Sequence, residues 1–417
     1  MNLSNAYELM SNLVCYTRVT KGHGLRGQVG NIEKLILKHR ITLLGVGPMS
    51  RLVTTKAVEL ANEYRFPIAL IPSRRQVDAA EFGGGYVENW STEQFAKYVK
   101  SVDRGGYALL SRDHSGPWQS SPSPEPADSE PSLEEAMDEV KASLSDDIRN
   151  GFNLLHIDPS LALLRGYSEV AVEDMAVELI AHCVSKMPNA NSCAFEVGTD
   201  EQDIAPDPID LSRERLKKLV AKLDKYNLPR PTFYVIQTGT KVAEKRNIGS
   251  FDQPLSLRGC LPPAVHLPSI LEMCTEEGVL LKEHNADYLS DRALRWHKRF
   301  GIHAANVAPE FGVTETQSLL KVLIELDMTL EFDAFSELVL TGGRWQKWML
   351  SDTESSDRDK VEIAGHYHFS DPEVMEIRAK AISAGLKSGL DVEGRIGHDV
   401  RCAIDRYMRP FGYGAAS

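Results

Sequence analysis

The sequence lacks the features that mark several large classes of protein. Its six cysteines include no CxxC pair, so a zinc ribbon is not expected. No segment reaches the roughly 18 apolar residues that a membrane-spanning helix needs, and the amino terminus has no basic stretch followed by an apolar run. Walker and GxSxG motifs are also missing, which argues against P-loop proteins and serine hydrolases. We expect a cytoplasmic protein with reduced cysteines in its core and no membrane partner.

Positive charge is scarce as well. The chain has 47 Lys and Arg against 59 Asp and Glu, which gives a formal net charge of −12. A surface that binds nucleic acid needs clustered basic residues to replace the counterions around the phosphates. We therefore expect no nucleic-acid partner, and instead a small-molecule substrate or a protein partner.

What the sequence does contain is an alternation of short apolar runs and amphipathic stretches of helical period. Apolar strands that alternate with amphipathic helices predict a parallel α/β sheet covered by helices. Eight such units favour a closed (β/α)8 TIM barrel, although an open doubly wound sheet gives the same alternation. The eight runs span 41–47, 67–73, 107–114, 152–160, 193–201, 232–240, 279–287 and 301–310.

The chain of 417 residues is longer than the roughly 250 residues of one barrel. Beyond residue 330 the alternation gives way to helical patterns, so we predict a TIM-barrel domain over 1–330 and a C-terminal helical lobe over 331–417. Within the barrel, a Pro/Ser-rich stretch at 115–133 has too few apolar residues to fold alone. We interpret it as a mobile loop that covers the site, or else as a surface insertion without function.

Polar residues follow nearly every predicted strand. The carboxyl ends of barrel strands face one mouth, so these residues should converge there. Asp113 and His114 end the third run, and His284 supplies an imidazole from a different strand end. Two imidazoles with a carboxylate from Asp200 or Glu201 suit Zn²⁺, Mn²⁺, Co²⁺ or Ni²⁺ better than Ca²⁺, and we predict a divalent metal site with zinc as the first choice. The alternative is that His284 is an ordinary polar residue in a loop.

A glycine-rich segment follows the second predicted strand. Gly83, Gly84 and Gly85 come after Arg74 and Arg75. Glycine lets backbone N–H groups approach a phosphate, and arginine adds bidentate charge, so the segment could hold one end of a sugar phosphate. A flexible turn beside surface arginines is the competing interpretation.

Seven segments lie in order along most of the chain: RRQVDAAEFGGGY, SRDHSGPWQ, GFNLLHIDPSL, EVGTDE, YVIQTGTK, KEHNADY and HAANVAPEFGVTET. Together they resemble the GatZ/KbaZ-type subunit of class II D-tagatose-1,6-bisphosphate aldolase. The resemblance implies a TIM barrel in which Asp113 moves protons and His114 and His284 bind metal. The family has an acidic residue after a Gly-Thr pair, and the resemblance places Asp200 there. It places Gln237 at the position of an amide side chain that the family shares at the next strand end. FEVGTDE is similar to the matching segment of metal-dependent tagaturonate epimerases, which are related to ketose-phosphate 4-epimerases.

The leading hypothesis is a metal-dependent lyase or epimerase of carbohydrate metabolism that acts on a ketose or ketose phosphate by retro-aldol cleavage or 4-epimerisation. The rival is a non-catalytic subunit that stabilises a separate aldolase. A homo-oligomer is also expected. The predicted catalytic residues are Asp113, Asp158 and Asp287; the predicted substrate-binding residues are Arg74, Arg75, Gln76, Gly84, Gln237, Asn306 and Glu310; and the predicted metal ligands are His114, Asp200, Glu201 and His284.

Overall fold

The computed structural model describes residues 32–121, 126–127, 130–189, 192–198, 208–252 and 263–414. Eight strands form a closed barrel in the order β1-β10-β9-β6-β5-β4-β3-β2, and every neighbouring pair is parallel. The predicted TIM barrel is confirmed: seven of the eight apolar runs contain one barrel strand each, and β3 extends one residue beyond the run at 107–114. The strands are β1 (Leu43–Val46), β2 (Ile68–Leu70), β3 (Ala108–Ser115), β4 (Leu154–Ile157), β5 (Ala194–Gly198), β6 (Phe233–Val235), β9 (Leu280–Glu283) and β10 (Ala304–Val307).

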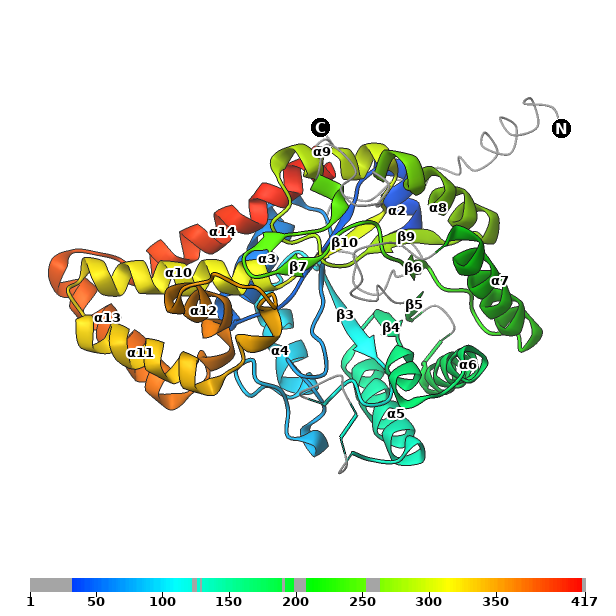
Figure 1. The fold of residues 1–417 in the computed structure, drawn as a ribbon, viewed down its shortest axis with the longest axis horizontal. Helices are drawn as coiled ribbons and strands as arrows, with labels where there is room; N and C mark the ends of the chain where they lie inside the picture. The colour runs from blue at the N-terminus through cyan, green and yellow to red at the C-terminus, as the bar shows by residue number, and fades with distance from the viewer. Residues whose placement is uncertain are drawn as a thin grey trace.

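A helix follows each barrel strand and covers the outside of the sheet (Figure 1). Serine side chains cap several of these helices at the point where the chain leaves the barrel mouth: Ser91 and Ser132 form capping boxes with Gln94 and Glu135. The helices are α3 (Arg51–Tyr64), α4 (Thr92–Val102), α5 (Leu133–Asn150), α6 (Glu169–Lys186), α7 (Ile209–Lys225), α8 (Pro263–Glu277), α9 (Asp291–Phe300) and α10 (Pro309–Glu325), and α2 (Ile32–His39) precedes β1.

The C-terminal helices form a lobe on one side of the barrel (Figure 1). It has its own apolar core, in which Leu319 and Leu323 of α10 pack with Phe335 and Val339 of the next helix. The predicted helical lobe is therefore present. Its elements are α11 (Thr329–Gly342), α12 (Asp357–Ala364), α13 (Pro372–Ser388) and α14 (Val392–Phe411), with 3-10 turns at Gln346–Trp348 (η5) and Gly365–His368 (η6).

Helix α14 belongs to both parts of the molecule. Its first turns pack in the lobe through Val392 and Ile396, whereas Val400, Ile404 and Phe411 lie in the barrel core. The second half of α14 lies between α9 and α3 in the ring of helices, and it contacts α10 along its length. The chain thus returns to the barrel after building the lobe, and the boundary at residue 330 stays a prediction.

Some details were not expected from the sequence. A small antiparallel hairpin, β7 (Val242–Ala243) with β8 (Arg246–Asn247), follows β6 outside the barrel. Cys183, Cys193 and Cys274 are free and buried as predicted, but Cys402 is exposed on α14, so the prediction of a core position is wrong for that residue. Among the described residues, no helix is both long and apolar enough to cross a membrane.

Candidate metal centre

One carboxylate and three imidazoles converge at the barrel mouth. One ligand atom each of Asp113, His114, His156 and His284 lie within 4.8 Å of one another. The carboxylate is central: Asp113 Oδ1 is 3.7 Å from His156 Nδ1 and 3.8 Å from His284 Nε2, and Oδ2 is 3.7 Å from His114 Nε2. His114 lies in β3, His156 in β4, and His284 directly follows β9, so barrel closure brings together residues far apart in the sequence.

A bulge in β3 lets two consecutive residues face the same centre. In a regular strand Asp113 and His114 would point to opposite faces. The register with β4 shifts between Arg112 and Ser115, and His114 adopts a left-handed backbone with φ of 46°. A non-glycine residue rarely takes this conformation, and the cost of order 1–3 kcal/mol is typical of functional sites. The bulge is therefore what turns both side chains inward.

Hydrogen bonds hold two of the imidazoles in definite orientations. His114 Nδ1 lies 2.6 Å from Asp158 Oδ2, which leaves Nε2 directed toward Asp113. His156 Nδ1 accepts the backbone N–H of His114, and its Nε2 lies 2.8 Å from the carbonyl oxygen of Gly198. Carboxylate and carbonyl partners of this kind fix the tautomer of metal-binding histidines. Asp158 thus positions His114 and does not point to the centre itself.

Burial and neighbouring charge set the protonation of the cluster. Burial raises the pKa of Asp113, but the imidazoles of His114, His284 and His156 more than offset it, so the pKa of this carboxyl lies well below its usual range. Burial lowers the pKa of His284 far below its usual value, more than Asp113 raises it. At neutral pH the centre therefore offers an ionised carboxylate beside a neutral imidazole, the forms that bind a metal ion.

The centre rests on further buried polar contacts inside the barrel. Asn306 Nδ2 donates to Asp113 Oδ1 at 3.3 Å, and its amide fills the space beside Gly45, where an added Cβ would come within 2.2 Å of Asn306 Oδ1. Lys282 Nζ lies 2.7 Å from both carboxylate oxygens of Glu196, and both side chains are buried. Lys282 precedes His284 by two residues, and its charge helps to lower the pKa of that imidazole.

A cavity of about 1000 Å³ opens from Asp113 and His114 toward the lobe. The predicted substrate residues Arg74, Arg75, Gln76 and Gly84 all line it. Arg74 is almost fully buried and pairs with Asp78 at 2.8 Å and Glu139 at 2.6 Å, while its Nη1 has no partner among the described residues. Gly84 has a φ of 75°, and an added Cβ would come within 2.9 Å of the carbonyl oxygen of Trp90, so a side chain would be strained here.

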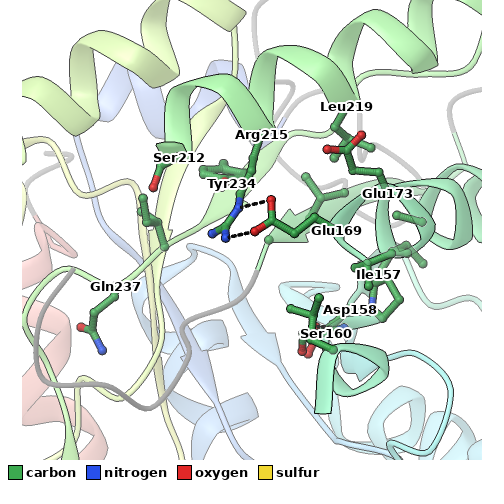
Figure 2. A pocket seen from close by; sticks show the side chains of 17 residues that line it. Ile157, Asp158, Ser160, Glu169, Glu173, Ser212, Arg215, Leu219, Tyr234 and Gln237 are labelled. Atoms are coloured by element: carbon green, nitrogen blue, oxygen red, sulfur yellow. Dashed lines mark hydrogen bonds and ion pairs between the residues drawn. The ribbon is translucent and has the colours of Figure 1, made fainter. Parts of the chain in front are cut away.

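A second, more apolar cavity of about 160 Å³ lies beside the carboxyl ends of β4, β5 and β6 (Figure 2). Glu169 and Arg215 form an ion pair across it, with Oε1 and Nη2 2.5 Å apart. Gln237 lines this second cavity, where its Oε1 accepts the backbone N–H groups of Gly239 and Thr240. The structure therefore does not place Gln237 among the residues that line the mouth cavity.

Asp287 is buried and Glu310 is partly buried at the start of α10, and both lie outside the lining of the mouth cavity. Asp287 Oδ1 accepts the backbone N–H groups of Ala308 and Glu310 at 3.0 and 2.9 Å. Burial and the nearby Glu310 raise the pKa of Asp287 to about 8. Glu310 in turn binds the hydroxyl of Tyr407 and the backbone N–H of Tyr288. These contacts join α10 and α14 to the loop after β9, which is a structural role.

His156 is the candidate ligand that the sequence analysis missed. The HIDP string, in which His156 precedes Asp158 by two residues at the end of a predicted strand, was the available signal. Asp200 and Glu201, predicted as ligands, lie outside the described residues. The donor set that is described, three imidazoles around one carboxylate, fits a first-row divalent ion such as zinc.

No family model and no curated protein matches this sequence. Solved structures match its fold. A probable tagatose 6-phosphate kinase from Sinorhizobium meliloti 1021 gives a TM-score of 0.69 at 16% identity, over 88% of this chain and 100% of that one. The fructuronate-tagaturonate epimerase UxaE from Cohnella laeviribosi gives 0.53 at 12%, over 91% and 86%. A fructose-bisphosphate aldolase from Campylobacter jejuni gives 0.52 at 10%, over 93% and 96%. These matches show a shared barrel fold.

Proposed function

We propose that this chain is a metal-dependent enzyme that acts on a ketose or ketose phosphate by retro-aldol cleavage or 4-epimerisation. The observation that carries the proposal is the convergence of Asp113 with three histidines, of which Asp113 and His114 line the mouth cavity. Two proteins of the same fold are named as a fructose-bisphosphate aldolase and a fructuronate-tagaturonate epimerase, which agrees with this chemistry. The resemblance to the GatZ/KbaZ-type aldolase subunit points the same way.

His114, His156 and His284 would hold the ion, and His156 would then release the long hydrogen bond that its Nδ1 accepts from the backbone N–H of His114. A divalent ion bound there polarises a carbonyl or hydroxyl oxygen of the substrate. Asp158 would keep the His114 ring in place, and the buried carbonyl of Gly198 would do the same for His156. The arrangement thus orients two of the three imidazoles before substrate arrives, which lowers the cost of organising the site.

Asp113 would carry the proton. Its carboxylate would accept the proton of the C4 hydroxyl as the C3–C4 bond breaks and the C4 carbonyl forms, and the electron pair would pass to C3 and the C2 carbonyl oxygen. Protonation at C3 then releases two fragments, which is aldol cleavage. Readdition of C3 to the other face of the retained aldehyde, with the proton returned from Asp113 to the C4 oxygen, gives the 4-epimer. One site can support either outcome.

The test is metal content and turnover of the purified full-length chain. We expect about one divalent ion per chain by mass spectrometry, and chelator-sensitive turnover of a panel of ketoses and their mono- and bisphosphates whose products separate cleavage from epimerisation. His156→Ala should lose the ion, whereas Asp113→Asn should keep it and lose turnover because an amide cannot accept the proton.

His398→Ala is the matched control, because this histidine is exposed on α14. It should keep both metal and turnover. A chain that binds no metal and turns over no ketose would overturn the proposal and favour the rival, a non-catalytic subunit that stabilises a separate aldolase. Turnover that survives Asp113→Asn would show that another group carries the proton.

A further inference from the structure

The mouth cavity is closed on one side by the lobe. Its wall includes the segments 343–348 and 367–371 of the lobe, opposite the loop after β2 and the metal centre. Tyr86 of that loop and Tyr367 of the lobe meet with ring centroids 5.0 Å apart. A substrate with one end at Asp113 and His114 would therefore extend toward residues of the C-terminal lobe.

The carboxylates that line this cavity already have partners. Asp78 and Glu139 pair with Arg74, and Asp113 lies among the histidines. Asp371 lies 2.7 Å from His368 Nδ1. None of these contacts involves Arg344 or Lys347.

Arg344 and Lys347 bring positive charge to the lobe side of the cavity. The Arg344 guanidinium lies over the rings of Tyr86 and Tyr367 at 5.9 and 5.5 Å, and Lys347 Nζ lies over Tyr367 and Trp348 at 4.9 and 5.1 Å. Within the described parts of the chain, neither cation has a carboxylate within 4 Å. Stacking on aromatic rings orients a cation and leaves its hydrogen-bond donors available.

Arg75 adds a third cation from the barrel side. It lines the same cavity. Burial raises the pKa of the Tyr86 hydroxyl, and the charges of Arg75 and Arg344 both act in the opposite direction, so both cations lie near Tyr86. Arg75, Arg344 and Lys347 thus line one cavity of a chain whose net charge is −12.

We propose that Arg75, Arg344 and Lys347 form a subsite for an anionic group, a phosphate ester or a carboxylate, at the end of the substrate remote from the metal centre. The C-terminal lobe would then be part of the active site and would select acidic ketoses over neutral ones. This inference rests on the proposed function, since it assigns the other end of the same substrate.

The first measurement is calorimetric titration of the chelator-treated full chain with inorganic phosphate, so that the anion has no metal ion to bind. Arg344→Ala/Lys347→Ala should bind phosphate about tenfold more weakly than the parent, because two charged donors are lost. Both residues are exposed, so the fold should persist, as circular dichroism would verify. The matched control is Lys387→Ala/Arg395→Ala, which removes the same charge from exposed positions of the lobe outside the cavity and should bind phosphate normally.

Kinetics distinguish the two anions and separate this inference from the proposed function. In the metal-loaded enzyme, the KM of the Arg344/Lys347 double variant should be higher than that of the parent for the anionic substrate that the site accepts, either a ketose phosphate or a ketouronate. Its KM for the neutral ketose should equal that of the parent. Phosphate binding that depends on the two cations in a chain without turnover supports the subsite while the proposed function fails. If the parent turns over substrate and the double variant shows the same phosphate binding and the same KM values as the parent, the subsite is overturned. The proposed function would not be affected by that result.

Discussion

His366, in the η6 turn of the lobe, shows how burial fixes the charge of a single residue. It is 1% exposed and packs against α10 at Gly312, where an added Cβ would come within 2.7 Å of its ring. Neither ring nitrogen has a hydrogen-bond partner among the described residues. Burial, together with the nearby charges of Lys347, His368 and Arg344, lowers the pKa of His366 to about 3. The folded protein therefore holds this imidazole neutral.

A pH dependence of stability follows from this residue. Between pH 6.5 and about 3 the unfolded chain binds a proton at His366 that the folded chain does not, so stability falls as the pH falls through that window. The loss should be about 2 kcal/mol at pH 5 relative to pH 8. In His366→Phe the difference in unfolding free energy between these two pH values, from urea titrations, should shrink by about this amount. An unchanged difference would contradict the assignment, and His398→Phe should leave it unchanged.

At the scale of elements, α14 ties the lobe to the barrel. The residue that completes this contact is Tyr413, just beyond the helix, which is 4% exposed. Its hydroxyl accepts the backbone N–H of Leu44 in β1 at 2.9 Å and donates to the carbonyl of Pro67, just before β2, at 2.8 Å. The end of the chain thus satisfies two buried backbone groups of the barrel.

Tyr413→Phe should lower the free energy of unfolding by about 1–3 kcal/mol, because it leaves both backbone groups without a partner and changes little else. Urea unfolding followed by circular dichroism measures the effect. Tyr226→Phe is the matched control, since Tyr226 is 58% exposed and its loss should cost almost nothing. Equal stability of Tyr413→Phe and the parent would show that water replaces the hydroxyl.

At the scale of the whole molecule, an ion at the metal centre would join distant parts of the barrel. Its ligands lie on β3, on β4 and directly after β9, which are strands far apart in the chain. Because the unfolded chain cannot hold these residues together, ion binding would add to folding stability by mass action.

Chelator should therefore lower Tm of the full chain. At a free-ion concentration 100 times the Kd, the stabilisation that is lost amounts to about 2.7 kcal/mol. Differential scanning calorimetry with and without chelator, and after zinc is restored, measures the change. His156→Ala should melt at the same temperature with and without zinc, whereas His398→Ala should respond as the parent does. If neither chelator nor zinc changes the Tm of the parent, the folded chain does not bind an ion at this centre.

Strand and helix periodicity and the polar residues at strand ends are local properties, so the barrel and much of its mouth could be predicted from the sequence alone. Asp113, His114 and His284 could be located in this way. Only the tertiary structure decided that a bulge turns Asp113 and His114 to one side, that His156 joins them, and that α14 returns to the barrel wall. It also separated strand-end carboxylates with the same sequence pattern: Asp113 faces the centre, whereas Asp287 accepts the first backbone N–H groups of α10. Those outcomes depend on register shifts and on contacts between residues hundreds of positions apart, which no local pattern records.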